Sequence, residues 1–430
     1  MIENFDIAVL GNWHLSSVTA AVLASHGKKT LWLNHDKKNP WTEFPAIPVM
    51  EPGLEDKISK TRAQNLLKHS NGFETWRAPI VWMAIDTPVN DRDEVDCSPL
   101  NQAIDELKKH KETLKLLILS SQVPIGTCQE FEKQLGIPVA YVPENLRLGK
   151  GIDTFEFADR TVIGAQKEST LKLVKDLMSQ FKTEFFTSDL PTSEMIKHAT
   201  NIFLATSISF SNEFARIGEA HGVDSVKVGQ ALKLDKRIGA AAYVIPGLGF
   251  AGGTLPRDLR ILQKVARENK IPSKLLDAVL DVNEATTDVV CEIARRQVAK
   301  QKGKVLILGY TYKADTDTLR RSLSVDVAKT LSQEGIEIIG FDPLMNQKDY
   351  SSIAPYLKHI ENWDEIPNSN ISCVMLLTAR KTFAELNWKS KSWAPHSLIL
   401  DAQNFLNANS ITDLNWSYKR LWQPCQEKST

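Results

Sequence analysis

The sequence predicts an α/β fold in which two doubly wound parallel sheets are joined by a helical segment, and three observations support this class. Short apolar runs alternate with helix-forming segments near both ends of the chain, as in parallel βαβ units. Between these parts, apolar residues recur at helical spacing over about residues 193–300. The length of 430 residues exceeds what one core usually holds, so two or three domains are expected.

The first sheet is expected in the N-terminal part, which we delimit as residues 1–190. Residues 5–10 form an apolar run that ends at Gly11, and residues 17–25 are rich in helix formers. Further strands are predicted at residues 29–33, 80–85, 114–119, 139–142 and 161–163. This order of strand, turn, helix and strand is typical of a Rossmann-like, dinucleotide-binding domain.

A central helical domain is predicted at residues 191–300 and a second Rossmann-like domain at residues 301–430. A glycine-rich loop at residues 239–253 interrupts the helical pattern. The second α/β part is predicted from strands at residues 305–308, 336–341, 374–377 and 398–401, with a helix over residues 325–331. The two α/β parts resemble each other only in this general layout.

The composition is that of a globular protein without a general electrostatic preference. The 52 Lys and Arg residues balance 52 Asp and Glu residues, so neither nucleic acid nor an anionic membrane is expected as a partner. No apolar run reaches the ~18 residues of a membrane-spanning helix. Five scattered cysteines without a CxxC pair favour reduced thiols in the cytoplasm and argue against a metal site.

The turn after the first strand matches the dinucleotide-binding pattern G-x-G-x-x-G only in part. In that pattern the second glycine lets the pyrophosphate approach the backbone, and an acid ending the second strand holds the ribose hydroxyls. Here Gly11 is kept, Trp13 takes the place of the second glycine and Asn34 that of the acid. Asp36 is a candidate substitute for the acid. Taken alone, the turn fits a modified dinucleotide site or an ordinary strand–helix turn.

The loop at residues 246–258, PGLGFAGGTLPRD, is more informative. Four glycines in seven residues allow a ligand to pass close to the backbone, while a proline near each end limits flexibility. The loop ends with a hydroxyl, a cation and a carboxylate, those of Thr254, Arg257 and Asp258. We therefore favour a ligand-binding loop over a plain surface loop.

Two further pairs of residues have a functional and a structural interpretation. Lys197 and Asn201 are spaced i, i+4 on a predicted helix, which by spacing alone favours a solvated helix face but also suits binding of a sugar hydroxyl and its developing charge. Arg320 and Arg321 suit a phosphate or carboxylate partner, or form a surface charge cluster.

Taken together, the motifs resemble the UDP-glucose/GDP-mannose dehydrogenase family over nearly the whole chain. The stretches that carry the resemblance are MEPGL (50–54), DTP (86–88), VPIGT (123–127), VPENLR (142–147), EMIK (194–197), NIFLAT (201–206), NE (212–213), DKRIG (235–239) with the glycine loop, and residues 309–313, 317–322 and 341–343. The resemblance implies NAD-dependent oxidation of C6 of a nucleotide sugar such as UDP-glucose, with two NAD per turnover, in polysaccharide or glycoconjugate biosynthesis. It also implies a homodimer formed by the central helices.

Site residues follow from the resemblance, position by position. The implied catalytic and sugar-contacting residues are Glu144, Lys197, Asn201, Thr254 and Asp258. The implied cofactor-binding residues are Gly11, Trp13, Asn34, Asp36, Thr87 and Gln122. The implied substrate-binding residues are Tyr243, Gly249, Phe250, Lys313 and Arg320.

The departures from the family concern the chemistry more than the sugar nucleotide. Thr254 stands where the family has its catalytic cysteine, and an alcohol gives almost no anionic nucleophile at neutral pH, unlike a thiol of pKa ~8.5. Gln122 stands in place of a threonine and Gln403 in place of a frequent arginine. Three alternatives therefore stay open: a divergent dehydrogenase, a redox-neutral or partial-oxidation variant on the same scaffold, and a non-catalytic protein that binds nucleotide sugars.

Overall fold

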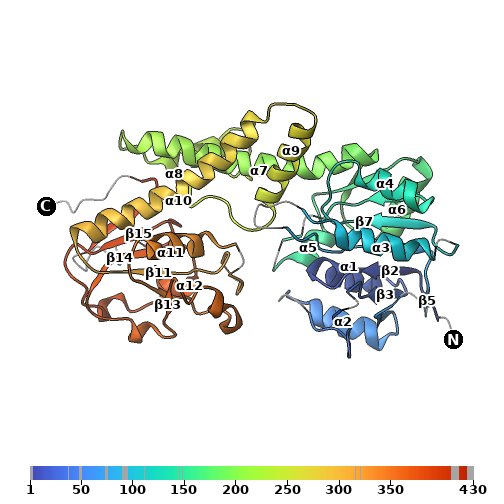
Figure 1. The fold of residues 1–430 in the computed structure, drawn as a ribbon, viewed down its shortest axis with the longest axis horizontal. Helices are drawn as coiled ribbons and strands as arrows, with labels where there is room; N and C mark the ends of the chain where they lie inside the picture. The colour runs from blue at the N-terminus through green and yellow to red at the C-terminus, as the bar shows by residue number, and fades with distance from the viewer. Residues whose placement is uncertain are drawn as a thin grey trace. The chain divides into compact units, whose positions relative to one another are not determined.

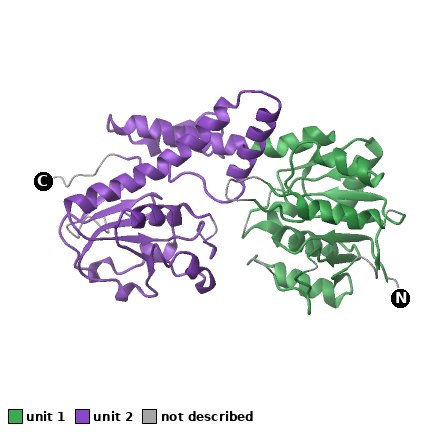
Figure 2. Cartoon of the chain, in the orientation of Figure 1, with its two compact units in different colours: residues 1–200 green, residues 201–430 purple. Residues whose placement is uncertain are grey.

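The structure is a computed structural model that describes residues 3–36, 38–47, 51–72, 76–89, 95–110, 112–144, 146–147, 149–314, 316–319, 321–407 and 416–423. The chain forms two compact units, residues 1–200 and 201–430, shown in different colours in Figure 2. The three domain limits given above remain predictions. Within the described ranges, no helix has both the length and the hydropathy needed to cross a membrane.

In the described part of the first unit, eight strands form one sheet in the order β10-β9-β8-β7-β6-β2-β3-β4. They are β2 (Ile7–Leu10), β3 (Thr30–Leu33), β4 (Leu67–Ser70), β6 (Ile80–Met83), β7 (Leu116–Leu119), β8 (Val139–Tyr141), β9 (Arg160–Ala165) and β10 (Glu184–Ser188). A short parallel pair, β1 (Glu3–Asn4) and β5 (Trp76–Arg77), lies outside this sheet. The helices of this unit are α1 (His14–Ser25), α2 (Leu54–Ala63), α3 (Ser98–Lys108), α4 (Thr127–Leu135), α5 (Gly151–Glu156) and α6 (Glu168–Leu177), and α7 (Leu190–Glu219) begins in it (Figure 1).

Two strands, β9 and β10, run opposite to the other strands of this sheet, which differs from the expected all-parallel pattern. β9 pairs with β8 in the antiparallel sense, through Ala140 opposite Ala165 and Tyr141 opposite Gly164, whereas the other neighbouring strands described in this sheet are parallel. The helix between them, α5, has six residues and spans only about 9 Å. The chain therefore enters β9 from the end at which it left β8.

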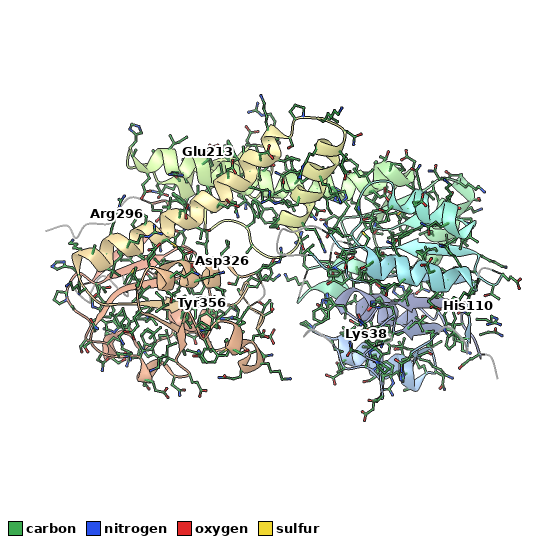
Figure 3. All side chains as sticks on the ribbon, viewed as in Figure 1. Lys38, His110, Glu213, Arg296, Asp326 and Tyr356 are labelled. Atoms are coloured by element: carbon green, nitrogen blue, oxygen red, sulfur yellow. The ribbon has the colours of Figure 1, made fainter. Side chains whose placement is uncertain are left out.

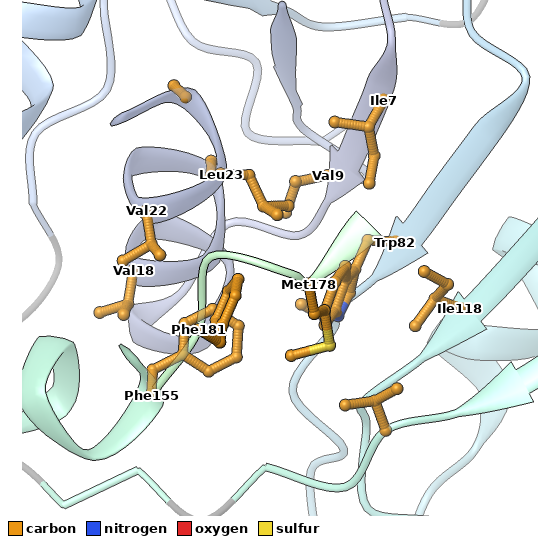
Figure 4. Close-up of a cluster of buried hydrophobic side chains, with 14 of the residues drawn as sticks. Ile7, Val9, Val18, Val22, Leu23, Trp82, Ile118, Phe155, Met178 and Phe181 are labelled. Atoms are coloured by element: carbon orange, nitrogen blue, oxygen red, sulfur yellow. The ribbon is translucent and has the colours of Figure 1, made fainter. Parts of the chain in front are cut away.

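The core of the first unit lies on both faces of this sheet, because the central strands are buried on both sides. Figure 4 shows the cluster on the face covered by α1, where Leu23 of the helix lies beside Val9 of β2. Phe155 and Phe181 meet edge to face, with ring centroids 5.1 Å apart. Each fully buried aliphatic or aromatic side chain contributes roughly 1.5–3 kcal/mol to folding, so this cluster fixes α1 on the sheet.

The second unit contains helices and a second sheet. After the end of α7 come α8 (Ser225–Leu234), α9 (Leu255–Glu268) and α10 (Lys274–Lys300), then α11 (Leu323–Gln333) and α12 (Lys381–Ala384). The strands described here, six in number, are all parallel and run in the order β13-β12-β11-β14-β15-β16. They are β11 (Lys304–Leu308), β12 (Ile338–Phe341), β13 (Lys358–His359), β14 (Ile371–Leu376), β15 (Leu398–Asp401) and β16 (Ser417–Arg420). Charged side chains such as that of Arg296 on α10 lie at the surface (Figure 3).

Both sheets contain the strand order 3-2-1-4-5-6 of a Rossmann fold, so the predicted fold class is confirmed. In the first sheet the order is β4-β3-β2-β6-β7-β8, and in the second it is the complete sheet. In such sheets ligands bind outside the carboxyl ends of the strands, where the order reverses direction. That point lies between β2 and β6 in the first unit and between β11 and β14 in the second.

Candidate active site

Gly11 lies at the point of the first sheet where a dinucleotide is expected. It follows β2 directly and has a φ of +152°, and a Cβ atom there would lie 2.5 Å from the carbonyl oxygen of Ala84, which follows β6. A side chain cannot be accommodated so close to backbone. The first position of the turn therefore requires glycine, and it leaves the turn close to the neighbouring strand.

The residues that depart from the glycine pattern form a turn held by side chains. The Ser16 hydroxyl donates to the Trp13 carbonyl at 2.7 Å and accepts from the Trp13 N–H at 3.1 Å. The Trp32 indole N–H donates to the Gly11 carbonyl at 2.9 Å. The Trp13 side chain, at the N-terminal end of α1, is 44% exposed, so the indole is not buried inside the turn.

A buried carboxylate beneath this turn has no role in the sequence analysis. Glu51 lies 2.9 Å from Nε2 of His14, and its oxygens accept hydrogen bonds from the N–H groups of Gly149 (3.1 Å) and Gly151 (2.7 Å). These contacts tie the first turn of α1 to the start of α5. Glu51 is part of the motif MEPGL, which the sequence shows. Its hydrogen-bond partners are distant in the sequence, so these contacts could not be predicted.

Asn34 occupies the usual position of the acid after the second strand, but the accessible carboxylate in this region is that of Asp36. The amide of Asn34 is buried; it donates to the Asn39 carbonyl and accepts from the Asp36 N–H, both at 2.9 Å. The Asp36 carboxylate is partly exposed, and hydrogen bonds from the Asn39 amide and the Lys38 N–H hold its pKa below the ordinary value. An ionised, accessible carboxylate here fits the ribose hydroxyls of a dinucleotide. Together with the close-approach glycine at position 11, these residues fit NAD.

The start of α7 contacts the loops that follow β7 and β8. Lys197 is buried and its ammonium donates to the carbonyl of Glu144 at 2.5 Å, whereas the Glu144 carboxylate accepts from the N–H of Leu146. The Thr87 hydroxyl donates to the carbonyl of Gln122 at 2.9 Å. The structure therefore brings Lys197 together with Glu144, and Thr87 together with Gln122.

Two residues beside Lys197 were missed by the sequence analysis. Glu194 is buried and accepts hydrogen bonds from the N–H groups of Gly126 (2.5 Å) and Cys128 (2.8 Å) at the start of α4, and burial raises its pKa. Nε2 of His198 lies 2.9 Å from the Val123 carbonyl. The spacing 194, 197, 198 places all three side chains on one face of a helix, which is the signal that could have identified them.

In the second unit, Asn201 and Asp258 form a buried pair. The Asn201 amide donates to the Asp258 carboxylate, and both side chains are buried. Thr254 precedes α9 and is exposed, and its hydroxyl makes no capping hydrogen bond. The Thr254 carbonyl accepts from the Asp258 N–H at 3.2 Å, so the two residues are one helical turn apart. A nucleophile at position 254 would stand at the N-terminus of a helix.

The glycine loop is closely packed at several positions. Gly249 has a φ of +106°, and a Cβ there would lie 2.6 Å from Oδ1 of Asn283; Gly252 has a φ of +83°, and its Cβ would lie 2.6 Å from the Tyr312 ring. The Phe250 side chain is buried, whereas that of Tyr243 is about half exposed. The loop is therefore a shaped segment with two positions that only glycine can fill.

The loop after β11 carries the predicted substrate residue Lys313. Its side chain is exposed, and its backbone is tied to Thr316, whose hydroxyl donates to the Lys313 carbonyl at 2.8 Å. The buried side chain of Arg380 donates to the Thr316 carbonyl at 3.0 Å. Arg320, the other predicted residue of this loop, lies outside the described residues.

Three of the four cysteines that the structure describes are buried, which bears on the expectation that no thiol takes the role of a cysteine at position 254. Cys128, Cys291 and Cys373 are buried, and burial raises the pKa of Cys128 well above the ordinary value, that of Cys291 to about 11 and that of Cys373 to about 12. Cys97 precedes α3, far in the sequence from the glycine loop. The protonated, desolvated thiols are unsuited to nucleophilic attack.

Comparison with known proteins identifies the chain. Residues 5–182 match the NAD binding domain of the UDP-glucose/GDP-mannose dehydrogenase family, residues 191–285 its central domain and residues 306–408 its UDP binding domain. The chain belongs to this family. It is an NAD-dependent dehydrogenase of nucleotide sugars, and its cofactor is NAD.

Relatives of this dehydrogenase match it over almost its full length. It is 29% identical to the UDP-glucose 6-dehydrogenase of Rickettsia bellii, over 96% of this chain and 98% of the relative. It is 30% identical to a putative UDP-glucose 6-dehydrogenase of Bacillus subtilis, over 94% and 96% of the two chains. The solved UDP-glucose dehydrogenase of Pyrobaculum islandicum shares the fold, with a TM-score of 0.85 and 24% identity over 98% of each chain. These relatives favour the first of the three alternatives.

Proposed function

We propose that this dehydrogenase oxidises C6 of UDP-glucose, or of a closely related UDP-sugar, and serves polysaccharide or glycoconjugate biosynthesis. The observation that carries the proposal is the full-length match to UDP-glucose 6-dehydrogenases, in which all three family domains occur in order. We further propose the site residues named in the sequence analysis as the residues that perform this reaction.

In the proposed cofactor site, NAD supplies the acceptor for the hydride that leaves C6. Gly11 and Trp13 would lie along the pyrophosphate, Asp36 would accept the ribose hydroxyls, and Asn34 would hold the Asp36 backbone. Thr87 and Gln122, joined by their hydrogen bond, would line the nicotinamide end. The support for this assignment is the accessible, ionised Asp36 beside a turn that approaches the neighbouring strand closely.

The catalytic side chains are proposed to act on the oxygen at C6. The Lys197 ammonium is fixed by the Glu144 carbonyl and would donate to that oxygen, stabilising the charge that develops as the hydroxyl proton leaves. The Asn201 amide, fixed by Asp258, would donate a second hydrogen bond. The buried Asp258 carboxylate would receive the proton through water, as a general base does.

Thr254 has a consequence for the second oxidation. Because its alcohol is not an effective nucleophile, we propose that water adds to the C6 aldehyde and forms the hydrate, with no enzyme–substrate bond. The hydrate then loses one hydride to a second NAD and one proton, which gives the acid. This route balances without a thiol, and it makes the second oxidation slow relative to the first.

The substrate-binding assignment concerns the glycine loop and the C-terminal sheet. Gly249, Phe250 and Tyr243 would follow the sugar nucleotide along the loop, while Lys313 and Arg320 would meet its phosphates. The half-exposed ring of Tyr243 supports a surface that a ligand can approach. The Lys313 side chain is exposed, so its ammonium is accessible to a diphosphate.

We also propose a homodimer in the cytoplasm. Phe203, Phe210 and Ile217 on α7 are all exposed and spaced seven residues apart, so they form one apolar stripe along the helix. Exposed stripes of this kind mark association surfaces. Replacing Phe210 by Glu should give a monomer in sedimentation velocity; an unchanged sedimentation coefficient would contradict the proposed interface.

Steady-state NADH formation with UDP-glucose, UDP-N-acetyl sugars and GDP-mannose tests the reaction. We expect the highest kcat/KM with a UDP-sugar, and between one and two NADH per sugar at early times, rising toward two as the hydrate is consumed. The absence of NADH formation with all three substrate classes, on protein with a cooperative thermal transition, would refute the proposal. Lys197→Met serves as the inactive control.

A further inference from the structure

The start of the glycine loop is held by side chains from distant parts of the second unit. The N–H of Gly247 donates to Oδ1 of Asn212 on α7 at 2.9 Å. The carbonyl of Gly247 accepts from the indole N–H of Trp422, which follows β16, at 2.8 Å. Both polar groups of this one peptide position are therefore bound by side chains, which is unusual because loop backbone more often bonds to other backbone or to water.

Phe250, three residues on, is held in the same way by one side chain. Asn283 on α10 accepts from the Phe250 N–H at 2.8 Å and donates to the Phe250 carbonyl at 3.1 Å. The same Oδ1 atom would lie 2.6 Å from a Cβ at Gly249. Residues 247–250 are thus bound at both ends of a four-residue arc, with the glycine required between them.

Trp422 is itself built into the second unit. It is 1% exposed, belongs to the same hydrophobic cluster as Leu248, and has a φ of +65°, which is rare for a side chain of this size. Its carbonyl accepts from the N–H of Ser225 at the start of α8 at 3.2 Å. A bulky residue keeps such a backbone conformation only where its surroundings determine it.

We infer that Trp422, together with Asn212 and Asn283, is a positioning residue of the sugar-nucleotide loop. The three side chains hold residues 247–250 in one conformation before the ligand arrives, so that binding does not have to order the loop. This inference rests on the proposed function for the identity of the ligand, a UDP-sugar. The hydrogen bonds from these three side chains to residues 247–250, which we call the clamp, do not depend on it. It assigns a role in substrate affinity to a residue that follows the last strand of the C-terminal sheet.

A matched pair of tryptophan variants tests the clamp. Trp422→Phe removes the indole N–H and keeps an aromatic ring. Trp393→Phe removes another buried indole N–H, from a residue that is 4% exposed; it donates at the same 2.8 Å, but to the Pro367 carbonyl, outside the loop. In hydrogen–deuterium exchange, the amides of residues 247–252 should exchange about fivefold faster in Trp422→Phe, the factor for one lost hydrogen bond, and at the wild-type rate in Trp393→Phe.

Calorimetry with UDP and with UDP-glucose measures the consequence for binding. Trp422→Phe should weaken both about fivefold and leave the affinity for NAD unchanged, whereas Trp393→Phe should change none of them. Equal exchange rates in the two variants, or equal affinities for UDP-glucose, would overturn the inference. If the wild-type protein binds no UDP-sugar, the proposed function fails on that measurement alone, while exchange still decides the clamp.

A second variant covers the case in which Trp422→Phe does not fold. Asn283→Asp keeps the acceptor for the Phe250 N–H but replaces the donor to the Phe250 carbonyl by a repelling oxygen. We expect it to weaken UDP-glucose binding about tenfold, since a buried carbonyl is left facing a charge. Unchanged binding in this variant would also overturn the inference.

Discussion

The two Rossmann-like sheets of this dehydrogenase share a backbone arrangement at the point where the strand order reverses. A Cβ at Gly11 would lie 2.5 Å from the Ala84 carbonyl, and a Cβ at Gly309 would lie 2.3 Å from the Thr378 carbonyl. In the first sheet the glycine follows β2 and the carbonyl follows β6. In the second sheet the glycine follows β11 and the carbonyl comes after β14. The same steric requirement therefore recurs in two halves whose sequences resemble each other only in general layout.

The two sheets differ in the acid that follows the second strand. Asp36 in the first unit is partly exposed, whereas Asp342 in the second is buried. Asp342 accepts from the N–H groups of Tyr310, Thr311 and Leu344, and Arg380 contacts its two oxygens at 2.7 and 3.2 Å. A carboxylate has about four lone-pair sites, so Asp342 has none left for a ribose. Strand order sets where a crevice forms, and the residues after the second strand decide whether it can hold a dinucleotide.

The largest expected effect is on kcat, and it distinguishes a catalytic lysine of the first unit from a substrate-binding lysine of the second. Lys197→Met should lower kcat by about 10²–10⁴-fold and change the Kd for UDP-glucose by less than about threefold, since the proposed role of Lys197 is in the transition state. Lys313→Met should instead weaken UDP-glucose binding by about tenfold, through a lost charge-assisted contact. Kinetics and calorimetry on both variants check this. Similar changes in kcat for the two lysines would break the division.

The next effect concerns the free energy of unfolding and the buried, fully hydrogen-bonded Asp342. Arg380→Met should destabilise the protein by about 3–5 kcal/mol, because it leaves the buried Asp342 charge unpaired. The first-unit counterpart, Asn34→Ala, should cost about 1–2 kcal/mol, since only neutral hydrogen bonds are lost. Arg295→Met removes a partly exposed partner of Glu334, also at 2.7 Å, and should cost at most about 1 kcal/mol. Urea unfolding of the three variants gives the order; equal losses would contradict it.

Thr254→Cys tests how much of the missing chemistry depends on one side chain. Thr254 is exposed at the N-terminus of α9, where the helix dipole lowers a thiol pKa, so a cysteine there would be partly thiolate at neutral pH. We expect the second oxidation to accelerate about tenfold, with NADH per sugar approaching two at earlier times. Thr254→Ser is the control and should behave like the wild type. An unchanged ratio in Thr254→Cys would mean that other residues also limit the second step.

The strands and the fold class of this protein could be predicted from the sequence better than the long-range hydrogen bonds that support the site. Strands such as β2, β11 and β15 follow from local apolar runs, and the fold class is confirmed. The expectation of an all-parallel first sheet was wrong for β9 and β10, because an apolar pattern carries no information on strand direction. Trp422 and Glu51 were missed, since their partners lie 175 and 98 to 100 residues away in the sequence. Such contacts depend on tertiary packing, which no local spacing encodes.

The smallest expected effect concerns Asp36 and the pH dependence of NAD binding. Asp36→Asn should weaken NAD about fivefold, by replacing an ionised acceptor of the ribose hydroxyls with a neutral amide. Hydrogen bonds from Asn39 and Lys38 lower the Asp36 pKa, so the carboxylate stays charged above its ordinary pKa and loses its charge only as the pH falls through the lowered value. The Kd for NAD of the wild type should therefore be constant from about pH 8 to about pH 5.

Fluorescence titration with NAD at both ends of this range measures the effect, with Asp189→Asn as the control. Asp189 is another first-unit aspartate whose pKa is lowered, by hydrogen bonds from Thr192, but it follows β10, away from the β2–β6 crossover. Its substitution should leave the Kd unchanged. Weakening of wild-type binding near pH 6 would instead indicate a histidine and would contradict the assignment to Asp36. Burial lowers the pKa of His35, the histidine next to Asp36, so its protonation is expected at a lower pH than that of an ordinary histidine.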